Sequence, residues 1–150
     1  FRSSFRIHYF GSKYILMSRI FFIAIALSIS SAALGQTHEN LVDLQPKDDY
    51  KNIRVHKLDS DSLASTFLIW VKKSVKEHFH AEHTEVVQVL EGEGVMTLGD
   101  ESFKIRSGDY IFIPKGTPHS VEVKHGSILK ALSIQTPLFD GSDRIFVSKE

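Results

Sequence analysis

The chain of 150 residues contains no cysteine. No disulfide can hold its fold together, and thiolate metal sites and a lipid-modified cysteine anchor are excluded. Long apolar runs are also missing: the most apolar stretch, Ile20 to Ile29, has about ten residues, whereas a membrane-spanning helix needs about twenty. These absences leave a chain that must be stabilised by an ordinary hydrophobic core, and whose metal ligands, if it has any, must be nitrogen and oxygen atoms.

An excess of charge of one sign is absent from the whole chain, because 18 Lys and Arg balance 18 Asp and Glu. The balance hides a difference between the two ends. Residues 1–35 carry four basic side chains and no acidic one, so residues 36–150 have 14 basic against 18 acidic side chains, a net charge of 14 minus 18, or −4. A weakly acidic segment without a basic stripe is a poor partner for nucleic acid.

The N-terminal segment is typical of a secretory signal. Met17 is followed by Ser18-Arg19 and the apolar run, and Ala33-Leu34-Gly35 places small residues where a signal peptidase reads them. We therefore expect a signal peptide from Met17 to Gly35, cleaved before Gln36, with residues 1–16 as upstream sequence. The mature protein is expected to be periplasmic or secreted, with no stable membrane anchor.

Residues 36–150 have the length of one domain and the pattern of an all-β protein. Short runs of alternating or β-branched apolar residues are separated by glycine, proline and aspartate turns, which favours a sandwich or barrel and leaves no convincing helix. The expected strands are Ile53–Leu58, Thr66–Val71, Val75–His80, Glu85–Leu90, Val95–Leu98, Phe103–Ile105, Tyr110–Ile113, Ser120–Val123 and Ile128–Gln135.

Four residues in this region are candidate metal ligands: His78, His80, Glu85 and His119. Side chains at positions i and i+2 of a strand share one face, so His78 and His80 can direct two imidazoles into the same space. Glu85 would add a carboxylate from the mouth of the next strand, and His119 would close the shell from elsewhere in the sheet. Imidazole and carboxylate together suit a divalent transition metal such as Fe, Mn, Ni, Zn or Cu.

The spacing of these residues resembles the two motifs of the cupin superfamily, G(x)5HxH(x)3-4E(x)6G and G(x)5PxG(x)2H(x)3N. The first motif is matched by His78, His80, Glu85 and Gly92, and the second by Gly108, Pro114, Gly116 and His119, so that eight of ten positions agree. Lys72 and Val123 stand where the motifs have glycine and asparagine. Neither position is a metal ligand in the family, and both departures concern local turn geometry.

The resemblance covers about Phe67 to Thr136 and implies a small single-domain cupin, a double-stranded β-helix jelly-roll barrel that binds a divalent metal and commonly forms a homodimer. We expect an N-terminal arm and lead-in strand over 36–64, the cupin barrel over 65–137 and a C-terminal extension over 138–150. Apolar residues of that extension should cover an open end of the barrel or pack on a second subunit. Trp70, on an expected strand, should be buried in the core or in an interface.

The function stays open between classes. An intact ligand set with free coordination positions favours a dioxygenase-like oxidoreductase acting on a small organic substrate. The alternatives are a non-catalytic module that binds a sugar or another small ligand, and an isomerase or epimerase. The candidates for an acid–base partner are Tyr110, Gln88 and His83, and the sequence leaves open whether His83 is a substitute ligand, a base beside the ligands or an exposed loop histidine.

Overall fold

The computed structural model describes residues 37–148, which fold into ten β-strands and no helix. The expected signal peptide, Met17 to Gly35, lies outside the described residues. Because residues 37–148 hold no helix, they hold none that could cross a membrane. The strands are β1 Ile53–Ser60, β2 Ser65–Val71, β3 Ser74–Phe79, β4 Thr84–Glu91, β5 Glu93–Leu98, β6 Glu101–Arg106, β7 Tyr110–Ile113, β8 His119–Val123, β9 Leu129–Thr136 and β10 Ile145–Phe146.

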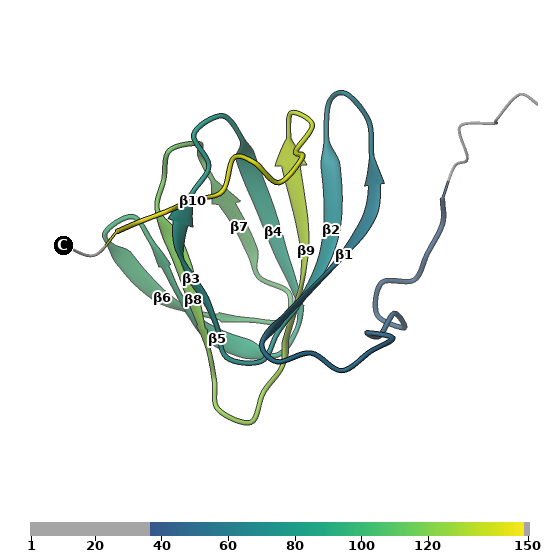
Figure 1. Cartoon of the computed structure of the whole chain (residues 1–150). Helices are drawn as coiled ribbons and strands as arrows, with labels where there is room; N and C mark the ends of the chain where they lie inside the picture. The colour runs from purple at the N-terminus through teal and green to yellow at the C-terminus, as the bar shows by residue number, and fades with distance from the viewer. Residues whose placement is uncertain (1–36, 149–150) are drawn as a thin grey trace, which may run out of the picture. The chain divides into compact units, whose positions relative to one another are not determined.

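The strands form two antiparallel five-stranded sheets that face each other (Figure 1). One sheet has the order β1-β2-β9-β4-β7 and the other has the order β10-β3-β8-β5-β6. From β2 onward, each strand lies in the opposite sheet from the one before it, except that β5 and β6 are neighbours in one sheet; this is the arrangement of a jelly roll. The predicted all-β barrel is confirmed, each of the nine expected strands begins and ends within two residues of an observed one, and the expected hairpin is the β5–β6 pair.

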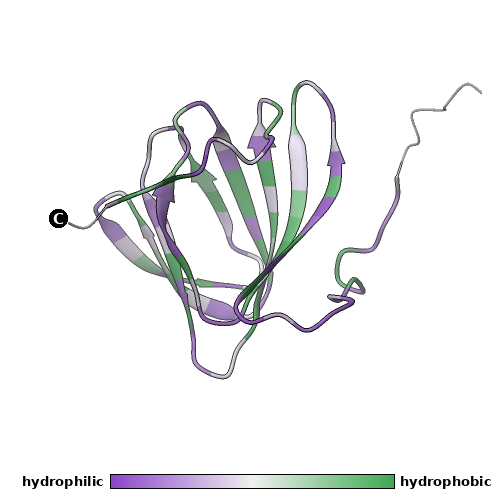
Figure 2. Cartoon of the chain, in the orientation of Figure 1, coloured by the Kyte–Doolittle hydropathy of each residue, from purple (hydrophilic) through white to green (hydrophobic). Residues whose placement is uncertain are grey.

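The core lies between the sheets and follows from the two-residue period of the strands. In β7, Ile111 and Ile113 are 5% and 2% exposed, whereas Tyr110 and Phe112 are 67% and 52% exposed. Hydrophobic and hydrophilic colours alternate along the strands in Figure 2 for this reason. The innermost cluster is drawn from both sheets and consists of Val71, Val89, Met96, Ile105, Ile111, Ile113 and Leu129.

Gly92 lies in the turn between β4 and β5, and two features of this position require glycine: its backbone conformation and the lack of room for a side chain. Its φ is +82°, a conformation that L side chains rarely adopt, and a Cβ there would lie 2.2 Å from the carbonyl oxygen of Ile128. Gly92 is the single residue between β4 of one sheet and β5 of the other.

The two departures from the cupin motifs have local explanations. Lys72 does not adopt a positive φ, so glycine is not required there. Its ammonium donates hydrogen bonds to Asp49 Oδ1 at 2.8 Å and to the Tyr50 carbonyl at 2.7 Å, which ties the lead-in segment to the end of β2. Val123 pairs with Gly94 of β5 and packs against the core cluster.

Residues 137–147, which we call the C-terminal strap, return across the barrel and pair with β3 through β10. Phe139 of the strap packs edge-to-face on Phe67 of β2, with ring centroids 6.1 Å apart. Ile145 and Phe146 remain 41% and 55% exposed. Trp70 is 4% exposed, which confirms the expectation that it is buried.

Candidate metal centre

The three histidines of the predicted site come together through the pairing of two strands. His78 on β3 and His119 on β8 are direct register partners in the antiparallel pair. His80 follows the end of β3, and its carbonyl oxygen accepts a hydrogen bond of 2.6 Å from the amide of Gly116. The loop before β8 is thus fastened to the chain after β3, and both histidine-bearing segments are held at one end of the barrel.

Each imidazole is oriented by a hydrogen bond from its Nδ1 to a backbone carbonyl. The acceptors are the carbonyl oxygens of Lys76 for His78 at 2.8 Å, Asp143 for His80 at 2.5 Å and Thr117 for His119 at 3.0 Å. A carbonyl can only accept, so Nδ1 carries a proton in all three rings, and in the neutral imidazole Nε2 then keeps its lone pair. This arrangement fixes the tautomer that ligates a metal through Nε2.

The nitrogen atoms that face inward form a compact set. One ligand atom from each of His78, His80 and His119 lies within 4.8 Å of the others. His80 Nε2 and His119 Nε2 are buried and have no hydrogen-bond partner among the described residues. Buried polar atoms are seldom left without a partner, so their convergence fits a cation that is held at this point.

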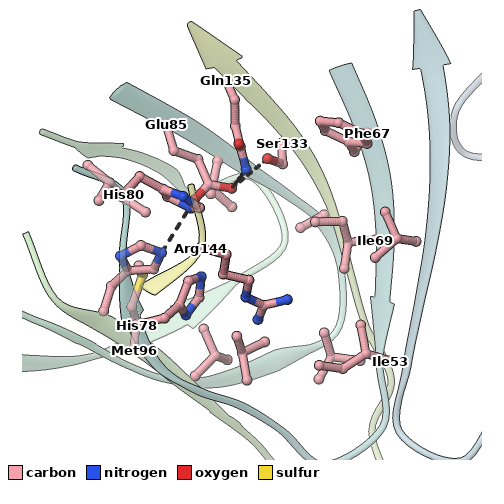
Figure 3. A pocket seen from close by; sticks show the side chains of 18 of the residues that line it. Ile53, Phe67, Ile69, His78, His80, Glu85, Met96, Ser133, Gln135 and Arg144 are labelled. Atoms are coloured by element: carbon pink, nitrogen blue, oxygen red, sulfur yellow. Dashed lines mark hydrogen bonds and ion pairs between the residues drawn. The ribbon is translucent and has the colours of Figure 1, made fainter. Parts of the chain in front are cut away.

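Glu85 enters the site from β4 in the opposite sheet. Its Oε2 lies 3.5 Å from His80 Nε2 and 3.4 Å from His119 Nε2. These separations are longer than ordinary hydrogen bonds and close to the roughly 3.0–3.4 Å between two ligands that are each bound about 2.1 Å from one ion. The other oxygen, Oε1, accepts a hydrogen bond of 2.5 Å from Ser133 Oγ, and Gln135 Nε2 lies 3.4 Å away (Figure 3).

The pKa shifts follow from burial and from these contacts. Burial by itself would raise the pKa of Glu85, but contacts with His119 and His80 and the hydrogen bond from Ser133 outweigh it and hold this pKa well below its ordinary value. Burial, with the nearby charges of His119 and Arg144, lowers the pKa of His78 to about 4. Burial would also lower the pKa of His80, but contacts with Glu85 and Asp143 raise it overall. Glu85 is therefore ionised and His78 neutral near pH 7, which are the forms that bind a metal.

The histidine cluster opens into a cavity of about 150 Å³ inside the barrel. An apolar cavity of about this size is large enough for a small organic molecule such as benzene. Apart from the four predicted ligands, Ser133, Gln135 and Arg144, every lining residue is apolar: Ile53, Val55, Phe67, Ile69, Val71, Val75, Val87, Met96, Ile105, Ile113, Val121, Ala131 and Phe139.

None of the three candidate acid–base residues, Gln88, Tyr110 and His83, lines the cavity beside the candidate metal centre. Gln88 and Tyr110 are exposed and do not line the cavity, so neither can act there. His83 is only 8% exposed, which excludes the alternative of an exposed loop histidine. Its Nδ1 contacts Asp143 Oδ2 at 2.6 Å and its Nε2 contacts the Leu138 carbonyl at 3.0 Å, so both nitrogens face the strap and not the histidine cluster.

Sequence reasoning missed the residues that support the site from β9 and the strap. Ser133 and Gln135 are polar residues two apart in an otherwise buried strand, a pattern that could have indicated a polar function at the inner face. Phe139, Asp143 and Arg144 carry no such signal. Phe139 packs edge-to-face on the rings of His80 and His83, with centroids 5.3 and 5.1 Å apart.

Comparison with known proteins agrees with the fold and the position of the site. The family model of the cupin domain matches residues 65–135. An uncharacterized protein of Aquifex aeolicus is 37% identical over 97 residues, which cover 65% of this chain and 79% of that protein. The chain belongs to the cupin superfamily, and the described residues hold one small cupin domain.

Two further proteins are informative. Quercetin 2,3-dioxygenase of Bacillus subtilis is 43% identical over 47 residues, which cover 31% of this chain but only 14% of that enzyme. The crystal structure of a conserved protein with a double-stranded β-helix domain from Klebsiella pneumoniae superposes with a TM-score of 0.64 at 12% identity, covering 77% of this chain and 100% of that one. The second likeness concerns the fold alone.

Proposed function

We propose that the protein is a metal-dependent oxidoreductase, of the dioxygenase type, that binds a divalent transition metal through His78, His80, Glu85 and His119 and acts on a small organic substrate. The observation that carries the proposal is the set of inward-facing imidazole nitrogens. Three backbone carbonyls fix the tautomers of the rings. Two of the nitrogens, His80 Nε2 and His119 Nε2, are buried without a hydrogen-bond partner among the described residues. The Glu85 carboxylate lies 3.4 to 3.5 Å from these two nitrogens, close to the separation of two ligands that bind one ion.

A metal bound there would supply an open coordination position and a Lewis acid beside the cavity. The residues of the chain orient the ligands and exclude water. Ser133 holds Glu85 by a hydrogen bond, the Asp143 carbonyl holds His80, and the apolar lining keeps bulk water away from the substrate. Electrostatic interactions at the site are stronger in such a setting than in water.

The similarity to quercetin 2,3-dioxygenase supports oxygen chemistry over other reactions, although the matched segment is a small part of that enzyme. The lining supports the same choice. Isomerases and epimerases need a positioned acid and base, and among the residues that line the cavity the only ionisable groups are the predicted ligands and Arg144.

The test is to purify the protein, identify its metal by elemental analysis and follow oxygen uptake with phenolic, thiol and keto-acid compounds. We expect His80→Ala and His119→Ala to lose most of the metal while the far-UV circular dichroism spectrum keeps its β signature, because apolar burial supplies most of the stability. The matched control is His125→Ala, which removes an exposed histidine outside the cavity. Equal metal content in the unmodified protein and the three variants would show that His80 and His119 are not metal ligands.

The second candidate function is a non-catalytic module for a small ligand. This function is favoured by the mostly apolar lining, in which the predicted ligands and Arg144 are the only ionisable residues. Zinc or no metal, together with saturable ligand binding and no oxygen uptake, would select the module over the enzyme.

Two further proposals concern the setting of the protein. Export is supported by the signal-like segment from Met17 to Gly35, and mass spectrometry of exported protein should give an N-terminus near Gln36; peptides from residues 1–15 in that material would contradict it. A homodimer is supported by the exposed Tyr110 and Phe112 on the edge strand β7. Sedimentation should then give twice the monomer mass, and a monomer at all concentrations would exclude it.

A further inference from the structure

Arg144 is the one arginine or lysine among the described residues that line the cavity. It belongs to the C-terminal strap and directly follows Asp143, whose carbonyl oxygen orients His80. Figure 3 shows its side chain extending into the cavity, with the imidazoles on one side and Ile53 and Ile69 on the other. A permanent positive charge is therefore placed in an apolar space beside the candidate metal centre.

The guanidinium has no counter-ion within the part of the chain that the structure describes. Its Nε is buried without a hydrogen-bond partner, and no carboxylate forms an ion pair with it. The neighbouring Asp143 carboxylate already accepts hydrogen bonds from the amides of Ala81 and Glu82 and contacts His83. The ring of Phe146 lies beside it, with its centroid 5.4 Å from Arg144 Cζ.

A partly buried charge without a partner is unfavourable for folding. Burial lowers the pKa of Arg144, and the charge of Glu85 offsets this only in part. The guanidinium stays protonated under all ordinary conditions. A ligand that brings a negative charge would remove this cost.

The net charge expected at the site also favours a negatively charged ligand. With a divalent cation bound (+2), the Glu85 carboxylate (−1) and Arg144 (+1) would give a net charge of +2 in a cavity whose lining is otherwise mostly apolar. Interactions between charges are strong in such an environment, so an anion is favoured over a neutral molecule. The cavity offers one guanidinium and no lysine, and a guanidinium can donate two parallel N–H···O hydrogen bonds to the two oxygens of one carboxylate.

We infer that Arg144 is a substrate-binding residue that pairs with a carboxylate, and that the substrate is a small organic acid whose apolar body fills the rest of the cavity. The inference rests on the proposed function in one respect: the same molecule would reach the metal centre. The carboxylate binding itself does not depend on the metal.

The test compares carboxylates with their neutral amides by isothermal titration calorimetry on the full chain, both metal-free and metal-loaded. The probes are benzoate against benzamide and phenylacetate against phenylacetamide, which differ little in shape. We expect each carboxylate to bind at least about tenfold more tightly than its amide, as one charge-assisted contact allows. Arg144→Gln should abolish this preference in the metal-free protein, and Arg144→Lys should keep part of it because the charge remains.

The matched control is Arg106→Gln, which removes an exposed arginine outside the cavity and should leave the preference unchanged. Equal affinities of acid and amide, no binding of any carboxylate to the unmodified protein, or a preference that persists in Arg144→Gln would each overturn the inference. The two proposals fail separately. An Arg144-dependent preference without metal or oxygen uptake would refute only the oxidoreductase, and oxygen uptake without the preference would refute only the role of Arg144.

Discussion

Replacing Ser133 with alanine tests whether the charged state of Glu85 is built into the fold. Ser133 is 0% exposed and Glu85 is 6% exposed, so neither side chain can turn to water when the contact is lost. The hydrogen bond from Ser133 Oγ to Glu85 Oε1 measures 2.5 Å, whereas the other polar contacts of that carboxylate measure 3.4 to 3.5 Å. Ser133 is thus the nearest of these partners to the carboxylate.

The expected cost follows from these contacts. A hydrogen bond to a charged group contributes about 1.5–3 kcal/mol, and a buried carboxylate that loses one is not rehydrated. We expect Ser133→Ala to lower the free energy of unfolding of the metal-free protein by about 1.5–3 kcal/mol at pH 7. That is a substantial part of the roughly 5–15 kcal/mol available to a domain of this kind.

The assay is urea unfolding followed by the fluorescence of Trp70, the single tryptophan of the chain, which is buried in β2. A double-mutant cycle with Glu85→Gln isolates the charge, because the same serine should contribute less to a neutral amide. The control is Ser102→Ala, which removes an exposed hydrogen bond to Thr97 and should cost no more than about 0.5 kcal/mol. A loss below about 0.5 kcal/mol for Ser133→Ala, or an equal loss in both backgrounds, would refute the reasoning.

Two other substitutions test the frame around the site. Gly92→Ala should destabilise the protein more than Gly126→Ala in urea unfolding: both glycines have a φ of +82°, but only at Gly92 would the new Cβ meet a backbone carbonyl, at 2.2 Å. The positive φ alone costs about 1–2 kcal/mol, so equal losses would mean that the close approach is not real. His83→Ala should leave the metal content nearly intact while hydrogen exchange of the strap amides speeds up, because His83 contacts the strap and not the histidine cluster. Loss of the metal in this variant would show that His83 is a ligand.

The convergence of the four predicted residues was accessible from the sequence because it depends on local rules. Two-residue spacing put His78 and His80 on one side, and the turn residues around Gly92 and Pro114 set the strand lengths. The same period shows why Gln88 was a poor candidate: it stands three residues after Glu85, an odd number, and so belongs to the opposite face of β4. Tyr110 is its register partner on β7 and shares that outer face.

The burial of His83 could not be read from its neighbours. It depends on contacts with Leu138 and Asp143, which lie 55 and 60 residues further along the chain. The strap has no repeating apolar pattern that would give its path, and its pairing with β3 involves only two residues. Arg144 was missed for the same reason, because its direction is set by where the strap crosses the barrel.

The C-terminal strap carries two of the proposed roles on adjacent residues. The carbonyl of Asp143 orients His80, its carboxylate fastens the strap to Ala81 and Glu82, and the next residue extends its guanidinium into the cavity. A substitution that loosens Asp143 should therefore weaken metal binding and carboxylate binding together, since both depend on the path of the same backbone. A substitution of Arg144 should change carboxylate binding and leave in place the backbone that orients His80. The choice of ligand can thus change through one side chain, while the geometry of the metal centre is kept by the backbone beside it.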